Sequence, residues 1–208
     1  MALVKYNNNS ISAVTSAASI PSGALTHIKT LTASSSSTLS FVDGSSDVVL
    51  DSTYPIYVFK FINIHPATDQ AKFSINFRDG GTDYDAVKTT TVFEGFHKED
   101  DTGTNLGYNT GEDLAQGTGF QTIANGVGNA NDDNCNGTVT LFNPSSTTFV
   151  KHFISTTSQN YRTSSPAEIN WFVAGYCNVT DAIDGVQFKF SSGNIDAGTI
   201  KLYGIKDS

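Results

Sequence analysis

Alternation of apolar and polar residues with a period of two is the feature that most constrains how this chain can fold. It is clearest in Ala71–Arg78 and Gly185–Ser191, where large apolar residues occupy every second position. These residues are Phe73, Ile75 and Phe77 in the first segment and Val186, Phe188 and Phe190 in the second. Side chains of a β-strand point alternately to opposite faces, so the pattern predicts strands with one buried face. We expect the intervening polar residues, including Ser74 and Asn76, to face water.

Further segments of strand-like composition are divided by clusters of turn-forming residues. The complete set is Ala24–Thr32, Thr38–Val42, Tyr54–Ile64, Ala71–Arg78, Thr89–Phe96, Thr138–Asn143, Thr148–Ser155, Glu168–Asn178, Gly185–Ser191 and Thr199–Lys206. Short strands at this spacing are typical of a sandwich or barrel, and no window repeats apolar residues at helical spacing for long enough to predict a substantial helix. The sequence contains 14 Phe, 8 Tyr and 18 Gly, which suits strands and turns. We predict an all-β, antiparallel, jelly-roll-like β-sandwich.

Two of the predicted strands are apolar on both faces. In Tyr54–Ile64 and Glu168–Asn178 the residues at odd and at even positions are both largely apolar. This pattern predicts central strands that are covered on both sides. Trp171, Phe188 and Phe190 are predicted core residues. Two kinds of turn are expected around the later strands: a tight turn at Asn143–Ser146, and chain reversals at Gly193-Asn194 and Ala197-Gly198 before the closing strand.

The segment Lys98–Asn134 contains no predicted strand. It is rich in glycine, and its charged residues are almost all acidic. An insertion of this length without secondary structure is unusual in a compact domain and is typically functional or flexible. We expect it to be the surface that contacts a neighbour or a ligand.

Residues 1–23 differ from the rest of the chain. After a short strand candidate at Leu3–Tyr6, Asn7–Gly23 is small and polar without a strand period, which predicts an extended arm for assembly or anchoring. The sandwich domain then spans residues 24–208. Residues 1–42 contain no Asp or Glu, whereas the whole chain carries a net charge of −8. The arm therefore suits docking onto another acidic protein surface, although a plain polar leader fits the same residues.

The charge and hydropathy patterns also constrain partners and location. An acidic chain lacks the basic face that binding to a nucleic-acid backbone requires. No apolar run approaches the length of a membrane-spanning helix, and Met1–Tyr6 leads directly into Asn7 without the apolar stretch of a signal peptide. We expect synthesis in a cytoplasm, no nucleic-acid partner and no insertion into a membrane.

No group of residues singles out a chemical reaction or a metal site. Cys135 and Cys177 are too few for a disulfide framework and are expected to be reduced, with one bridge between them as the alternative. His97 precedes Glu99, Asp100 and Asp101, a run that suits either a divalent cation or, more often, a solvated acidic loop. Asn129–Asn134 is rich in oxygen ligands but lacks the spacing and closing Glu of a calcium loop. We predict no catalytic, cofactor-binding or metal-binding residues and no cofactor.

Two kinds of residue could act on sugars or bind them: carboxylates and exposed tyrosines. A glycosidase needs two carboxylates held across a cleft, and no pair of acids in the sequence stands out for that role. Exposed tyrosines could stack on sugar rings, and the candidates are Tyr84, Tyr108 and Tyr161. Single surface tyrosines are common, which favours the interpretation without a ligand.

Four segments resemble a family of virion structural proteins of marine tailed bacteriophages, notably phages of cyanobacteria. They are Thr32–Phe41, Asp51–Pro66 (DSTYPIYVFKFINIHP), Gly137–Thr157 (GTVTLFNPSSTTFVKHFISTT) and Val173–Ile205. The likeness covers most of the chain from Ala24 onward. It implies an all-β module of a tail fibre or particle-surface appendage, assembled in the host cytoplasm and located in the virion. It supplies no catalytic residue.

Two functional hypotheses follow. The first is a non-enzymatic structural subunit, a symmetric homo-oligomer and expected trimer, that decorates the capsid or forms part of the tail and binds other virion proteins through its arm. The alternative is a tail-fibre receptor-binding module that recognises a glycan on the host surface through Lys98–Asn134 or an aromatic groove. The residues leave the choice between head and tail open.

Overall fold

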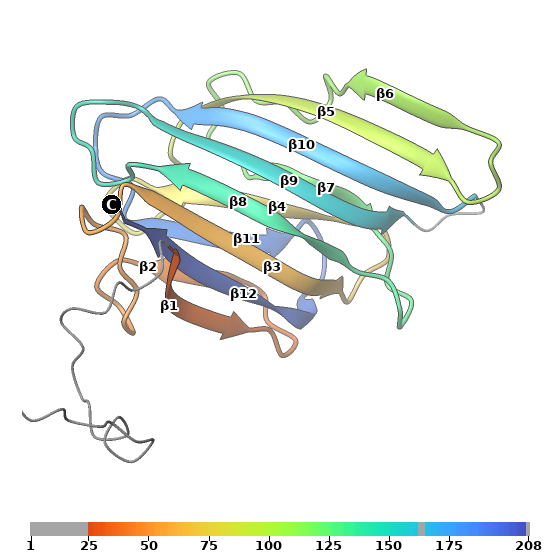
Figure 1. Cartoon of the computed structure of the whole chain (residues 1–208), viewed down its shortest axis with the longest axis horizontal. Helices are drawn as coiled ribbons and strands as arrows, with labels where there is room; N and C mark the ends of the chain where they lie inside the picture. The colour runs from red at the N-terminus through yellow and green to blue at the C-terminus, as the bar shows by residue number, and fades with distance from the viewer. Residues whose placement is uncertain (1–24, 162–164, 207–208) are drawn as a thin grey trace, which may run out of the picture.

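The computed structural model describes residues 25–161 and 165–206, and the regular elements in this part of the chain are all β-strands (Figure 1). The strands are β1 (Leu25–Thr32), β2 (Leu39–Val42), β3 (Ile56–Pro66), β4 (Ala71–Arg78), β5 (Lys88–Lys98), β6 (Thr104–Tyr108), β7 (Gln121–Val127), β8 (Cys135–Phe142), β9 (Lys151–Tyr161), β10 (Ala167–Cys177), β11 (Gly185–Phe190) and β12 (Ile195–Ile205). Their pairings are antiparallel, so the predicted all-β, antiparallel class is confirmed. The predicted arm 1–23, with its strand candidate Leu3–Tyr6, lies outside the described residues.

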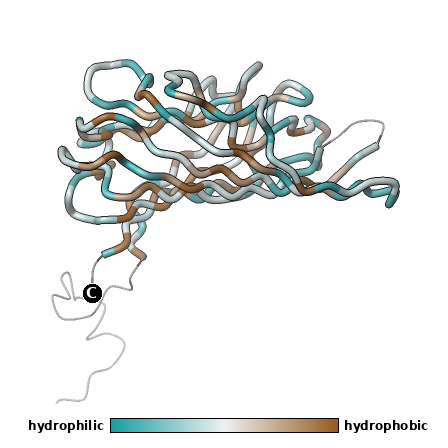
Figure 2. Tube along the Cα trace, turned by 90° about the horizontal axis from the view of Figure 1, so that it is seen from above, coloured by the Kyte–Doolittle hydropathy of each residue, from teal (hydrophilic) through white to brown (hydrophobic). Residues whose placement is uncertain are grey.

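The strands form two layers that face each other. The large layer has the order β1-β12-β3-β8-β9-β10-β5-β6, and the small layer has the order β2-β11-β4-β7 (Figure 1). The layers join where β7 meets β9, at the single pair Val127 and Tyr161. The view from above shows the two layers, with hydrophilic segments gathered in the turns at both ends (Figure 2). Away from this junction, the β1–β2 connection carries the chain from one layer to the other, and its Ser36 pairs with Ile195 at the start of β12.

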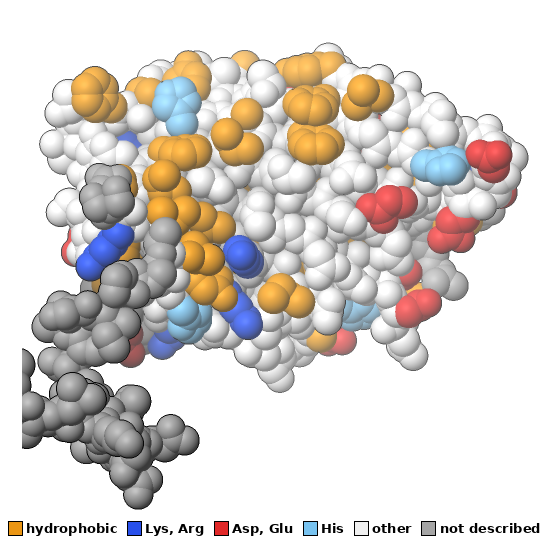
Figure 3. All heavy atoms as spheres, in the orientation of Figure 1, with side chains coloured by type: hydrophobic (Ala, Val, Ile, Leu, Met, Phe, Trp, Pro, Cys, Tyr) orange, Lys and Arg blue, Asp and Glu red, His pale blue; other side chains and the backbone are white. Residues whose placement is uncertain are grey.

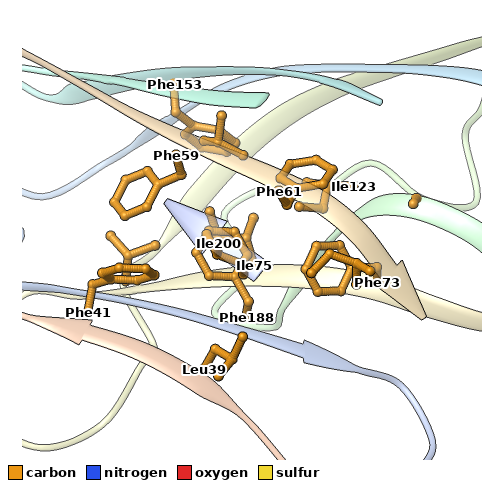
Figure 4. Close-up of a cluster of buried hydrophobic side chains, with 14 of the residues drawn as sticks. Leu39, Phe41, Phe59, Phe61, Phe73, Ile75, Ile123, Phe153, Phe188 and Ile200 are labelled. Atoms are coloured by element: carbon orange, nitrogen blue, oxygen red, sulfur yellow. The ribbon is translucent and has the colours of Figure 1, made fainter. Parts of the chain in front are cut away.

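Aromatic side chains from both layers fill the space between them (Figure 4). Phe73 of β4 stacks on Phe188 of β11, with ring centroids 5.8 Å apart and planes inclined by 16°. Across the layers, Phe41 of β2 meets Phe59 of β3 edge to face at 5.3 Å. Such pairs stabilise a core beyond the burial of their area. Trp171, Phe188 and Phe190 are all buried, which confirms their prediction as core residues.

The prediction that Lys98–Asn134 is a structureless insertion is wrong. The segment contains β6 and β7, and most residues of β7 are buried. Its polar residues hid the strand, because Gln121 looks like a surface residue in the sequence. In the structure the Gln121 amide nitrogen donates to the carbonyl oxygens of Glu112 and Thr122, and its oxygen accepts from the Thr90 hydroxyl at 2.6 Å. These bonds offset the cost of burying the amide.

The predicted wet face of β4 is also wrong, since Ser74 and Asn76 are buried. The segment between β6 and β7 and the β4–β5 connection cover that face. The Asn76 amide nitrogen donates to the carbonyl oxygens of Tyr84 and Thr118, one from each covering segment. Alternation in the sequence marks the two faces of a strand but does not reveal a loop that packs over the polar one.

The predicted turns have mixed outcomes. Asn143–Ser146 is a turn in which the Ser146 amide donates to the Asn143 carbonyl at 3.1 Å, and Gly193 lies in the turn between β11 and β12. The predicted reversal at Ala197-Gly198 is wrong, because both residues lie inside β12, at a register shift. Gly198 has a φ of +113°, and a Cβ there would lie 2.5 Å from the Asn63 carbonyl oxygen. The glycine therefore marks a β-bulge and a close backbone approach.

Candidate functional site

The outer face of the large layer carries exposed apolar side chains (Figure 3). The pairing register places these residues on the side opposite the core, from β3 at one side to β6 at the other. The main ones are Ile62, Phe93, Leu106, Tyr108 and Ile154, with relative exposures of 40%, 42%, 74%, 52% and 50%. We call this set, together with Phe172 and Ala174, the outer apolar face. Extended exposed apolar surfaces of this kind commonly mark interaction sites.

Aromatic residues lie in one transverse row of the outer apolar face. Cross-strand pairing aligns Phe172 of β10 with Phe93 of β5, and Phe93 with Tyr108 of β6. The rings of Phe93 and Phe172 stack with centroids 4.9 Å apart and planes inclined by 13°. Adjacent stacked rings present a flat apolar surface that is already ordered, which lowers the entropy cost of covering it.

This face corrects the prediction that Tyr54–Ile64 and Glu168–Asn178 are covered on both sides. Both segments are interior strands of the large layer, β3 and β10, and their inward residues are buried as expected. Their outward residues include the exposed Ile62 and Ala174 and the half-buried Phe172. The apolar residues on the outward side of β10 therefore belong to an apolar face that the described part of the chain does not cover.

Charge on the same face is divided between two regions. Lys60 of β3 and Lys201 of β12 are directly opposite each other in the register, and the Lys60 ammonium lies 5.5 Å from the Tyr203 ring centroid. Like charges in directly opposite positions destabilise a sheet. Neither lysine takes part in the ion pairs found among residues 25–161 and 165–206. Acidic side chains gather at the far end of the layer (Figure 3). The exposed Glu168 lies at the start of β10, and the exposed Asp101 lies in the turn between β5 and β6.

A cleft opens between the two layers at the end where β5 and β10 extend past β4. We call it the end cleft, and its volume is about 490 Å³. Its lining comes from five strands and from the segments before β4 and β10: Gln70, Lys72, Glu94, Phe96, Lys98, Asn125, Gly126, Tyr161, Ser165, Ala167 and Ile169. A concave site of this size, with apolar and aromatic walls and a few polar groups, has the usual make-up of a small-molecule site.

Charged groups in the end cleft are held in different ways. The Lys72 ammonium donates to the Glu112 carboxylate at 2.5 Å, so this pair is neutral as a unit. Burial raises the pKa of Glu94 from its ordinary value, a hydrogen bond from the Asn109 amide at 3.5 Å lowers it, and the nearby Glu112 charge raises it further. Glu94 is thus a partly desolvated carboxylate with one long hydrogen bond from the protein, a state common among groups that contact ligands.

Gly126 shapes one wall of the end cleft. It has a φ of +75°, which glycine adopts readily and other residues rarely do. A Cβ at this position would lie 2.4 Å from the Tyr161 ring, so the ring packs directly on the glycine backbone. Of the tyrosines named as sugar-stacking candidates, Tyr161 lines the end cleft, Tyr108 lies on the outer apolar face, and Tyr84 is half-buried beside Gly185.

The acidic segments considered for a cation have local roles in the structure. His97 Nε2 lies 3.0 Å from Asp101 Oδ1, and Asp100 accepts hydrogen bonds from the Thr102 backbone and hydroxyl. In Asn129–Asn134, the buried Asp133 accepts from the Ala130 amide and from the Asn160 side chain. Within the described ranges, no group of three or more His, Cys, Asp and Glu side chains converges as a metal site.

Cys177 lies between two buried lysines. Register pairs it with Lys88 of β5 on one side and with Lys151 of β9 on the other, and all three are fully buried. Both cysteines are free thiols, as expected, and the alternative bridge is not formed. Burial raises the pKa of Cys177 to about 12, although the two ammonium groups lower it. Burial lowers the pKa of Lys88 to about 8, and its ammonium donates to the Asn76 side chain and the Ala86 carbonyl.

Comparisons with known proteins add no relative. No protein-family model, curated protein or solved structure matches this chain. In residues 25–161 and 165–206, no helix is long and apolar enough to cross a membrane.

Sequence reasoning missed the end cleft as a site. Its lining residues are spread over the chain from Gln70 to Ile169, and no local motif joins them. One local signal was present: Glu94, Phe96 and Lys98 alternate along one strand, so they share a face that mixes opposite charges with an aromatic ring.

Proposed function

We propose that this chain is a non-enzymatic structural subunit of a tailed-bacteriophage particle, present in the virion as a symmetric homo-oligomer, with a trimer expected. Its N-terminal arm, residues 1–23, would bind other proteins of the capsid or tail. The outer apolar face carries the proposal, because it is the surface that a second copy would cover. The resemblance of four segments to phage virion proteins supports the setting.

The strand order supports a jelly-roll interpretation of the fold. With β1, β12 and the β9–β10 hairpin set aside, eight strands remain in two sheets, β2-β11-β4-β7 and β3-β8-β5-β6. When the eight strands are numbered along the chain, the first sheet has the order 1-8-3-6 and the second sheet has the order 2-7-4-5. That is the order of a jelly roll, an architecture used by viral capsid proteins and by lectins. The fold by itself does not assign the function.

Charge complementarity favours a second copy of this chain as the occupant of the outer apolar face. The unpaired Lys60–Lys201 region lies over β3 and β12, whereas Glu168 and the β5–β6 turn provide acidic groups at the other end. A head-to-tail contact brings the acidic end of one copy onto the lysines of the next. Repetition of that contact closes into a ring when the rotation permits.

The role of this face is tested by the oligomeric state of the full chain in analytical ultracentrifugation. A trimer is expected, and Phe93→Lys should dissociate it, because a charge at the centre of an apolar contact is costly to bury. Phe149→Lys is the matched control, since Phe149 is 70% exposed but lies in the turn between β8 and β9. A monomer at all concentrations, or equal effects of the two substitutions, would contradict the proposed interface.

The virion role has its own test. Antibodies raised against the sandwich should label intact particles purified from an infected host, at symmetric positions on the head or tail. Particles without any label would contradict the proposed location. The purified protein should release no product from host envelope polysaccharide, and saturable depolymerisation that depends on one acid would contradict the non-enzymatic part of the proposal.

A further inference from the structure

The end cleft is separate from the outer apolar face. Glu94, Phe96 and Lys98 project from β5 toward the cleft, whereas Phe93 projects from the same strand to the opposite face. A ligand in the end cleft therefore leaves the outer apolar face free. The two surfaces can be tested independently, because a substitution on one face of β5 does not alter the other.

We propose that the end cleft binds an acidic saccharide, a short chain of sugar rings that carry carboxylates. The inward residues of β5 present a carboxylate, an aromatic ring and an ammonium in succession at Glu94, Phe96 and Lys98. Alternate residues of a strand are about 7 Å apart, so this row extends over roughly 14 Å. A row of that length suits more than one sugar ring.

Each part of the lining matches one part of such a ligand. Phe96 and Tyr161 provide aromatic surfaces against which the apolar face of a sugar ring can pack. Glu94, Gln70 and Asn125 supply acceptors and amide donors for hydroxyl groups. Glu94 accepts a hydrogen bond from Asn109 at 3.5 Å, which is long, so the carboxylate keeps capacity to accept from a ligand.

Lys98 makes the site selective for a negative charge. Lys72, the other ammonium in the lining, is already paired with Glu112 at 2.5 Å. Among the described residues, the Lys98 ammonium has neither an ion pair nor a side-chain hydrogen bond, and it interacts with the exposed Asp100 only at longer range. A carboxylate on the ligand would supply the missing partner, with a charge-assisted hydrogen bond stronger than a neutral one.

Other classes of ligand fit less well. A peptide is usually gripped along the unpaired edge of a sheet, but the lining side chains come from strand faces and from strands that are paired. A nucleotide would bring adjacent phosphate charges to one point close to Glu94 and Glu112. The carboxylates of an acidic saccharide are spaced one per ring, so one of them can reach the Lys98 ammonium while hydroxyl groups of another ring face Glu94.

The test uses trigalacturonate and its methyl ester, which share a sugar backbone but differ in charge. Isothermal titration of the full chain should show saturable binding of trigalacturonate, at least about tenfold tighter than binding of the ester, and weaker at high salt. Equal binding of acid and ester would overturn the proposed class of ligand. Absence of saturable binding of either would overturn the site.

Variants connect the binding to the named residues. Lys98→Met should abolish the preference for the acid over the ester, and Glu94→Gln should weaken both by about tenfold. Lys206→Ala is the charge-matched control, because Lys206 is exposed and lies after β12, outside the cleft lining. Loss of the preference in Lys206→Ala, or its survival in Lys98→Met with an unchanged circular dichroism spectrum, would contradict the role of Lys98.

Discussion

The ammonium of Lys88 lies 2.5 Å from the side-chain oxygen of Asn76, in a site where both residues are buried. The same oxygen accepts from the Phe77 amide at 2.9 Å, and the Asn76 nitrogen donates to two carbonyls from the covering segments. Asn76 thus connects β4, the start of β5 and the segment before β7 through one amide group. A buried cation whose direct partners are all neutral is costly, and the charges of Asp79 and Asp85 offset only part of its desolvation.

The first prediction concerns pH. Burial lowers the pKa of Lys88 from 10.5 to about 8. Between these values the folded state has lost the proton and the unfolded state still holds it, so the free energy of unfolding rises with pH. The contribution is up to about 1.4 kcal/mol per pH unit. Urea unfolding at about pH 7 and about pH 9 measures this change in the free energy of unfolding as a shift of the urea midpoint.

Lys88→Met serves as the reference for that measurement. Wild type should gain stability over the variant as the pH rises across this range. The comparison also removes the effect of the buried cysteines, whose raised pKa values act in the opposite direction in both proteins. A difference between the two proteins that does not depend on pH would mean that Lys88 titrates normally.

The second prediction concerns the core. Phe188 contacts Phe41, Phe59 and Phe73 and is fully buried. Phe188→Ala should lower the free energy of unfolding by about 3–5 kcal/mol, because it leaves a cavity between the layers. Phe149→Ala, at an exposed turn position, should cost less than about 0.5 kcal/mol. Chemical denaturation of both variants checks the contrast.

How far the sequence predicts this fold is clear from β11 and β7. The alternation of Val186, Phe188 and Phe190 identifies β11 and its buried face, since one side of the strand meets water and the other meets the core. β7 is largely buried on both faces, yet it contains Gln121, whose side chain is satisfied by Thr90 and Glu112 from elsewhere in the chain. Local propensity does not contain that information, so the strand resembled a loop.

The candidate sites, like the strands, were predictable from the sequence only in part. The apolar outward residues of β10 were visible as a two-sided pattern, but the pattern does not distinguish a covering layer in the same chain from one in another copy. The end cleft depends on bringing Lys72 and Glu94 beside Tyr161. For Glu94 the proximity comes from the pairing of β5 with β10 and of β10 with β9, and for Lys72 from the pairing of β4 with β7 and of β7 with β9. Both are properties of topology and not of spacing in the sequence.

The third prediction concerns the paired lysines. Lys60 and Lys201 repel each other in the single chain, and in the proposed oligomer an acidic neighbour offsets that repulsion. Lys60→Gln should therefore stabilise an isolated subunit slightly but weaken the trimer. Sedimentation of both proteins at several salt concentrations measures the stability of the trimer. The wild-type trimer should dissociate more readily as salt screens the charge contact. A trimer unaffected by the substitution and by salt would leave the charge contact without support.

The fourth prediction concerns the thiols. Cys135 and Cys177 are buried, and burial raises the pKa of both, so little reactive thiolate is available in the folded protein. An aromatic disulfide reagent should label neither thiol under native conditions and both in denaturant. Rapid native labelling would indicate that the sandwich opens near β8 or β10 far more often than its packing suggests.

The last prediction concerns the arm. The twelve strands described between Leu25 and Ile205 pair with one another. Deletion of Met1–Gly23 should leave a soluble protein that unfolds cooperatively with a midpoint close to that of the full chain. The same protein should fail to join particles when it is supplied to an infection that lacks the full-length chain, because the proposed attachment is lost. Urea denaturation measures the stability of the sandwich, and analysis of purified particles measures whether the protein is attached. If the truncated protein is unfolded, the arm is part of the folding unit. If the truncated protein joins particles normally, the attachment surface is on the sandwich, and the acidic end and the outer apolar face are then the candidate contacts with other virion proteins.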